Sequence, residues 1–167
     1  LAGDYLFARA AQLASETDSV PLMTLFASTL AIIVNGEINQ LFAKRAVVKL
    51  AAYEKRIYAK TASLFETACK SAAMLATEDE GVHEKMRQYG YQIGMAFQVV
   101  DDVLDFTGAQ ETVGKPVAND LRQGVMTLPT IIFYEQQGEP TLVEKALAGD
   151  AEEEEILFLV EAIREQG

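Results

Sequence analysis

Apolar side chains recur every three or four residues along most of the chain, which is the spacing of one face of an α-helix. Good helix formers fill residues 22–115, which contain no proline, and no segment alternates apolar and polar residues between hairpin turns. The pattern therefore predicts an all-α protein without a sheet, folded as one helical domain over residues 1–167. The expected helices cover residues 3–14, 21–42, 50–76, 81–107, 118–137, 141–148 and 152–166.

The expected helix at 21–42 is apolar on nearly every side rather than along one stripe. A helix of this kind is buried on most sides, either in a core or at an interface between subunits. Its most apolar stretch, from Pro21 to Val34, is too short to cross a bilayer, so we expect no transmembrane segment.

The run from Phe97 to Asp105 is the sharpest chemical feature of the sequence. On a helix, Gln98, Asp101, Asp102 and Asp105 fall on one side, because positions three and four apart are neighbours. Three carboxylates on one side repel one another, so a cation is expected to offset them. Mg²⁺ prefers oxygen ligands and shares its shell between one or two carboxylates, water and substrate phosphates. The run predicts a Mg²⁺ site, although a solvated acidic face would show the same residues.

Charge and cysteine content exclude several classes of protein. The net charge is −11, of which −7 belongs to residues 139–167, and no basic stripe interrupts it. An acidic protein without such a stripe is a poor binder of nucleic acid. The single cysteine, Cys69, cannot form an internal disulfide, and no signal peptide is visible, so we expect a cytoplasmic protein.

Two further segments carry residues suited to binding an anion. The turn Gly114-Lys115-Pro116 would offer backbone amides and one ammonium group, and Asp120 adds a carboxylate if the loop folds back. Lys60-Thr61 leads directly into an apolar run, where a lysine at the edge of a buried helix face can pair with a phosphate. Taken alone, the Gly114-Lys115-Pro116 turn is better explained as an ordinary loop with a surface lysine, and most basic residues near Lys60 are better explained as solvated surface charges.

In this order and spacing, these segments resemble the C-terminal part of the trans-isoprenyl (all-trans polyprenyl) diphosphate synthases. The resemblance covers most of the chain, from residue 3 to residue 130. It is carried by Gly3–Ala10, Gly36–Gln40, Lys60–Phe65, Gly94–Phe106, Gly114-Lys115-Pro116, Asp120 and the Leu128-Pro129 step.

The resemblance implies an isoprenoid-synthase-type helical bundle around a central cavity, with two aspartate motifs that hold Mg²⁺. It further implies a homodimeric prenyltransferase that condenses isopentenyl diphosphate with an allylic diphosphate to a longer all-trans polyprenyl diphosphate. The implied metal ligands are Asp101, Asp102, Asp105 and Asp120; the diphosphate-binding residues are Lys60 and Lys115; the catalytic residues are Lys60, Thr61 and Gln98.

Two departures from the family pattern affect this interpretation. Val125 stands where the family often has a lysine, so one diphosphate contact is missing or is supplied by another residue such as Arg122. The chain also contains only one Asp-Asp-x-x-Asp motif. We therefore expect it to be a segment of a longer synthase, and we expect the isolated segment to be inactive.

Other classes of protein remain as alternatives. A non-catalytic subunit of a heteromeric prenyl synthase would share the fold, but such subunits usually lose their aspartates. Terpene cyclases pair one aspartate motif with an Asn/Asp, Ser/Thr, Glu triad, and Gln123 after Asn119-Asp120 does not meet it. A purely structural helical domain is the least specific alternative.

Overall fold

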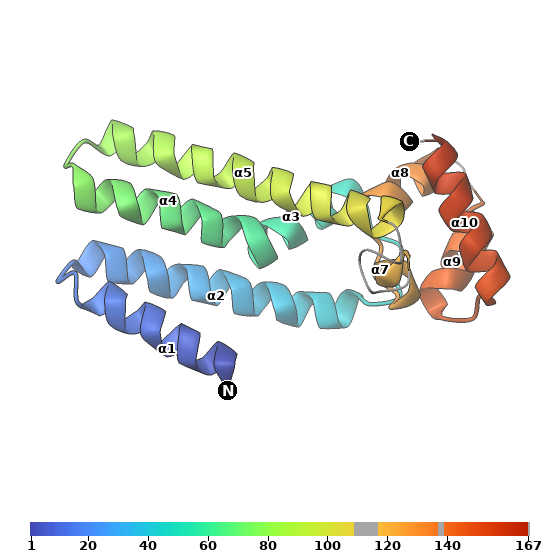
Figure 1. Cartoon of the computed structure of the whole chain (residues 1–167), viewed down its shortest axis with the longest axis horizontal. Coiled ribbons are helices and arrows are strands. Elements are labelled where there is room, and N and C mark those ends of the chain that lie inside the picture. The colour runs from blue at the N-terminus through green and yellow to red at the C-terminus, as the bar shows by residue number, and fades with distance from the viewer. Residues whose placement is uncertain (109–116, 137–138, 167) are drawn as a thin grey trace. The chain divides into compact units, whose positions relative to one another are not determined.

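The computed structural model describes residues 1–108, 117–136 and 139–166, and helices make up its regular structure (Figure 1). The described residues contain no strand, so the all-α prediction is confirmed. The elements are α1 (Ala2–Ser15), α2 (Val20–Ala43), α3 (Leu50–Ile57), the π-helical turn η1 (Tyr58–Ala62), α4 (Ser63–Ala76), α5 (Glu80–Thr107), α7 (Asn119–Arg122), α8 (Leu128–Glu135), α9 (Pro140–Ala148) and α10 (Glu153–Gln166).

One predicted helix is wrong. The expected helix at 118–137 is broken between α7 and α8, where Gly124 adopts a left-handed φ of 73°. A Cβ atom at Gly124 would lie 2.8 Å from the carbonyl oxygen of Leu147, so the chain turns here in close contact with another segment. Pro129 then falls in the first turn of α8, where its missing N–H costs nothing.

The residues form two compact units. The first unit comprises residues 1–37 and 58–95, and the second comprises residues 38–57 together with the described residues from 96 onward. The long helices α2 and α5 contribute residues to both. That residues 1–167 form a single domain stays a prediction.

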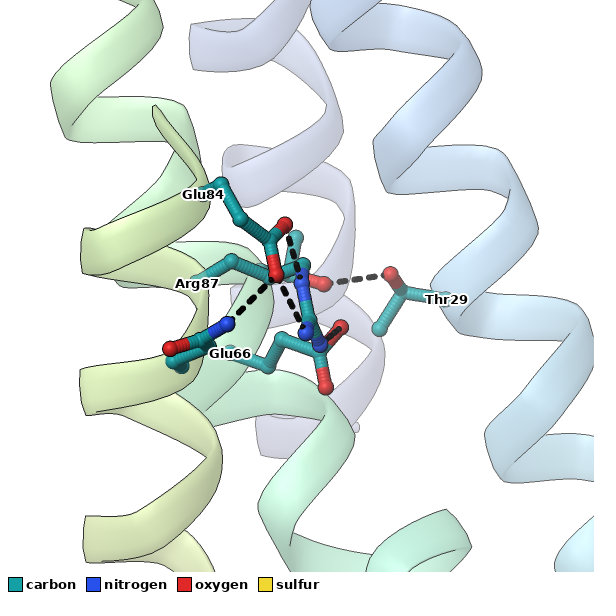
Figure 2. Close-up of polar contacts among 6 residues, drawn as sticks. Thr29, Glu66, Glu84 and Arg87 are labelled. Atoms are coloured by element: carbon teal, nitrogen blue, oxygen red, sulfur yellow. Dashed lines mark hydrogen bonds and ion pairs between the residues drawn. The ribbon is translucent and has the colours of Figure 1, made fainter. Parts of the chain in front are cut away.

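In the first unit, α1, α2, α4 and α5 lie side by side (Figure 1). The Phe7 and Phe26 rings join α1 to α2, with their centroids 6.3 Å apart. The hydroxyls of Thr29 and Thr67 share a buried hydrogen bond between α2 and α4 (Figure 2). Most buried side chains here are small (alanine, serine or threonine), so the helices approach closely; a Cβ at Gly90 of α5 would lie 2.5 Å from the carbonyl oxygen of Phe65.

Helix α2 has 24 residues and extends one residue beyond the predicted helix at each end. By length and composition alone, Val20–Phe42 could cross a membrane: an 18-residue window within it has a mean hydropathy of 1.5, and only 11% of that window is buried. The argument that the apolar run is too short to span a bilayer is therefore wrong. A core or interface helix of a soluble protein passes the same test, so the expectation of no transmembrane segment stays a prediction.

The second unit has the larger buried side chains. They come from helices distant in sequence and pack α3, the end of α5 and the segment after α7 against α8, α9 and α10. The largest fully buried side chains are Tyr53, Phe106, Leu121, Met126, Ile131, Leu147 and Leu159. This core holds the C-terminal turns of α5, and with them the aspartates, against α3 and α7.

Candidate functional site

The three aspartates of α5 do not share one environment. Asp101 is exposed, Asp102 is only 3% exposed, and Asp105 is half-buried. The side-chain amide of Gln98 donates to Asp101 Oδ2 at 3.2 Å and to Asp102 Oδ1 at 2.9 Å. Gln98 thus joins the first two carboxylates across one helical turn, which lowers the cost of placing them together.

Asp102 is held from α3 as well. The hydroxyl of Tyr53 donates to Asp102 Oδ2 at 2.8 Å, and both side chains are buried. Burial raises the pKa of Asp102, while the hydrogen bonds from Gln98 and Tyr53 and the charge of Arg56 act against that rise. Sequence reasoning missed Tyr53 and Arg56; their spacing of three on a predicted helix, just before Lys60, was the available signal.

Asp105 binds the chain at the start of α7. Its Oδ1 and Oδ2 accept the backbone N–H groups of Asn119 and Asp120 at 3.2 and 3.1 Å, and its carbonyl accepts the N–H of Ala118 at 2.8 Å. These bonds satisfy amides that begin a helix and lack partners within it. They also bring Asp120 beside the α5 aspartates, because the segment from Ala118 folds back onto α5.

Lys60 and Thr61 lie on the π-helical turn between α3 and α4, within the first unit. Lys60 is exposed and Thr61 is half-buried. Single π turns inside α-helices are rare and often occur at functional sites. This one faces two glycines: a Cβ at Gly36 of α2 would lie 2.6 Å from Ala59 Cβ, and one at Gly94 of α5 would lie 2.5 Å from Ala62 Cα.

Arg122 binds groups outside the set of predicted site residues. Its guanidinium forms a bidentate ion pair with Glu153 of α10, and its Nε donates to the carbonyl of Val117 at 2.9 Å. Glu153 raises the pKa of Arg122, and Arg122 lowers that of Glu153. The suggestion that Arg122 replaces the lysine absent at Val125 therefore has no support in the geometry.

The remaining predicted residue, Lys115, lies outside the described residues, as does the rest of the Gly114-Lys115-Pro116 turn. The second unit thus brings together Gln98, the three α5 aspartates and Asp120, while Lys60 and Thr61 belong to the first unit.

Asp101, Asp102, Asp105 and Asp120 form an acidic cluster. Their carboxylate oxygens are the ligands that a hard divalent cation prefers. Within the described ranges, no three Asp, Glu, His or Cys side chains lie close enough to hold a metal alone. Asp102 and Asp105 already accept hydrogen bonds on both oxygens, and Asp101 is the exposed carboxylate. The cluster therefore fits an ion that takes one or two carboxylates here and its other ligands from water and phosphate.

Comparison with known proteins identifies the family of the chain. The family model named polyprenyl synthetase matches residues 1–163. Solanesyl diphosphate synthase 2, chloroplastic, of Arabidopsis thaliana is 38% identical over 170 residues, which is 100% of this chain and 40% of that protein. Heptaprenyl diphosphate synthase component 2 of Geobacillus stearothermophilus is 39% identical over 130 residues, covering 77% of this chain and 41% of that protein.

Among solved structures, the polyprenyl synthase from Caulobacter crescentus CB15 complexed with calcium and isoprenyl diphosphate has a TM-score of 0.90 to this chain. The two are 37% identical, and the match covers 99% of this chain and 52% of the other. The all-helical fold is thus that of the isoprenoid synthases over about half of their length. The chain spans about 40% of the length of the curated relatives it matches.

Proposed function

The chain belongs to the polyprenyl synthetase family, and from that premise we propose that its parent protein condenses isopentenyl diphosphate with an allylic diphosphate. The product would be an all-trans polyprenyl diphosphate five carbons longer. The observation that carries the proposal is the acidic cluster around Asp101, Asp102 and Asp105, which gathers several carboxylates beside buried apolar packing. Such a cluster suits a metal ion shared with a diphosphate.

The proposed reaction needs no protein nucleophile. The allylic C–O bond breaks as diphosphate leaves, the double bond of isopentenyl diphosphate attacks the allylic cation, and a proton is lost. Bound Mg²⁺ would neutralise the charge that develops on the leaving diphosphate. We propose that Asp101, Asp102, Asp105 and Asp120 hold that metal with the substrate.

The other proposed site residues act on the substrate directly. Lys60 and Lys115 would contact diphosphate oxygens through charge-assisted hydrogen bonds. Thr61 and Gln98 would place oxygen atoms near the developing carbocation. Support for the first of these roles comes from the exposure of Lys60 on a π turn, and support for the last comes from the place of Gln98 beside Asp101 and Asp102.

We further propose that the parent protein is a homodimer. The support is the uncovered apolar surface of α2, where Val34, Leu41 and Phe42 are 57%, 67% and 87% exposed. A surface of this kind marks a site of protein contact. Light scattering of the parent protein at micromolar concentration should give a dimer mass, and a monomer mass would contradict the proposal. We also propose a cytoplasmic location, which cell fractionation tests.

A hetero-oligomer is the second candidate. The Geobacillus relative is named as a component of its synthase, which indicates more than one kind of chain in that enzyme. In this alternative the chain would serve as a non-catalytic subunit. Its retained aspartates favour the catalytic role.

Incubation of the full-length protein with Mg²⁺, isopentenyl diphosphate and a series of allylic primers tests the main proposal. Mass spectrometry should detect products that grow by five carbons, and it also gives their length. Failure to extend any primer would contradict the catalytic role. Extension only after addition of a second subunit would favour the heteromeric alternative.

We also propose that residues 1–167 alone do not turn over substrate. They contain one Asp-Asp-x-x-Asp motif, and catalysis requires that the leaving diphosphate is held in a defined geometry. The same assay on the isolated segment should show no product, and any turnover would contradict this proposal.

A further inference from the structure

Tyr53 is a polar side chain buried in the core of the second unit. It is 1% exposed, and it is among the largest fully buried side chains of the protein. A buried hydroxyl without a partner is costly, so its orientation is set by the acceptor it can reach. That acceptor is Asp102 Oδ2, at 2.8 Å. An apolar phenylalanine would fill the same space without this constraint.

Arg56 lies on the same helix as Tyr53 and contacts its ring. Its guanidinium carbon lies 5.5 Å from the centroid of the Tyr53 ring, within the range of a cation–π contact. Its Nη2 donates to the backbone carbonyl of Met126, which follows the turn at Gly124. Arg56 thus ties the Tyr53 ring to a backbone segment that is itself buried, since Met126 is 1% exposed.

The two oxygens of Asp102 are therefore held from two helices. Gln98 on α5 donates to Oδ1, and Tyr53 on α3 donates to Oδ2. A carboxylate with one fixed donor can still rotate about its Cβ–Cγ bond, whereas one with a donor on each oxygen cannot. The remaining lone pairs of Asp102 are consequently presented in one direction.

We propose that Tyr53, braced by Arg56, is a positioning residue that holds the Asp102 carboxylate in the orientation needed to receive the divalent metal and its diphosphate. This inference rests on the proposed function, because it assigns Asp102 to the metal site. Groups that hydrogen-bond a ligating carboxylate change metal affinity by about 10- to 100-fold when removed. Tyr53 itself touches neither metal nor substrate and acts through Asp102.

The test is a Mn²⁺ titration of the full-length protein, followed by electron paramagnetic resonance, in the presence of inorganic pyrophosphate. Tyr53→Phe removes only the hydroxyl, and it should weaken Mn²⁺ binding by about 10-fold. It should also raise the Mg²⁺ concentration needed for half-maximal activity, while kcat at saturating Mg²⁺ stays within about threefold of the wild type. Mn²⁺ affinity equal to the wild type would overturn the proposal.

Tyr134→Phe is the matched control. Tyr134 lies in the second unit and donates to a carboxylate, Glu144 Oε1, at 2.7 Å, but this pair is exposed. The control deletes the same hydroxyl-to-carboxylate bond and should leave Mn²⁺ affinity unchanged. Equal weakening by Tyr53→Phe and Tyr134→Phe would show a general loss of stability and would overturn the positioning role.

A double-mutant cycle shows whether Tyr53 acts through Asp102. In an Asp102→Asn background, Tyr53→Phe should change Mn²⁺ affinity by less than about twofold, because its target has been removed. The same loss in both backgrounds would overturn the proposal. If Tyr53→Phe does not fold, Arg56→Lys decides, since lysine keeps the charge but loses the planar brace; wild-type affinity in that variant would overturn it.

Failure of this inference is distinguishable from failure of the proposed function. If the wild-type protein neither binds Mn²⁺ with pyrophosphate nor extends any primer, the proposed function fails and this inference fails with it. If the wild-type protein does both and Tyr53→Phe matches it, only the positioning role of Tyr53 is lost.

Discussion

The two halves of α5 differ in whether their charged side chains are paired with opposite charges. In the N-terminal half, Arg87 donates to Glu84 through two nitrogens at 2.7 Å and reaches Glu66 of α4 at 3.0 Å, as Figure 2 shows. In the C-terminal half, Asp101, Asp102 and Asp105 have no lysine or arginine among residues 88–107 to oppose them. One half neutralises itself, and the other keeps an excess of negative charge.

The difference indicates which charges serve the fold and which serve a ligand. Arg87 is shared by Glu84 and Glu66 and so links α5 to α4. Because these charges are already paired, they have little tendency to bind a further ion from solution. The aspartates are tolerated because neutral donors on Gln98, Tyr53 and the start of α7 bind them, while Arg56 brings positive charge near Asp102 and Arg122 brings it near Asp105. Sites that oppose stability in this way are expected where function requires them.

Removal of one charge from the acidic half should give the largest effect. Asp101→Asn in the full-length protein is expected to lower kcat by roughly 100-fold or more, because Asp101 is one of the proposed metal ligands and the most exposed of the three α5 aspartates. Its melting temperature should change little, since substitutions of exposed residues rarely alter stability. Glu84→Gln in the other half is the control and should keep kcat. Steady-state kinetics with near-normal kcat for Asp101→Asn would contradict the assignment.

A second prediction concerns Lys60, because the C-terminal half of α5 has no lysine or arginine of its own. If Lys60 contacts substrate diphosphate, Lys60→Ala removes a charge-assisted hydrogen bond of about 1.5–3 kcal/mol. We therefore expect kcat/KM for the allylic substrate to fall by roughly 10- to 100-fold. Lys55→Ala, which removes an exposed lysine on the preceding helix α3, should change kcat/KM less than about twofold. Equal losses in both variants would indicate a general electrostatic effect instead.

Gly94 tests the packing near the junction of the two halves. A Cβ at this position would lie 2.5 Å from Ala62 Cα, so Gly94→Ala must displace the π turn or α5. Overpacking of this kind typically costs about 1–3 kcal/mol, which urea unfolding measures. At Gly3 of α1 a Cβ would meet nothing within 4 Å, so Gly3→Ala should be neutral or slightly stabilising. Equal stability of the two variants would contradict the close contact.

The smallest expected effect is a pH dependence in the self-neutralised half. Hydrogen bonds from Arg87 and Gln88 lower the pKa of Glu84 to about 2. Because the folded pKa lies below the unfolded one, the stabilisation is present above the unfolded value and is lost as pH falls toward 2. The stability difference between wild type and Glu84→Gln should therefore shrink from pH 6 to pH 3. It should also shrink in high salt, because the pair is exposed; a difference independent of pH would contradict the assignment.

Most helices could be predicted from the sequence because their apolar periodicity is local. Those at 3–14, 21–42, 81–107, 141–148 and 152–166 agree with the structure to within about two residues at each end. The break in the expected helix at 118–137 was missed, although Gly124 and Pro129 are residues that end and begin helices. The contact of Gly124 with Leu147 could not be predicted, because Leu147 is distant in sequence. The segment 50–76 also contains a π turn, which Gly36 and Gly94 on other helices approach closely, and the apolar periodicity of one helix does not show such a contact.

By itself the sequence determined the all-helical class, the apolar character of α2 and the shared face of Gln98 with the aspartates, since each depends on spacing along one helix. Only the tertiary structure decided how the aspartates differ. Asp102 is buried because α3 supplies Tyr53, Asp105 is bound by the backbone at the start of α7, and Asp101 stays exposed. These partners lie 14 to 49 residues away along the chain, and helical periodicity carries no information over such separations.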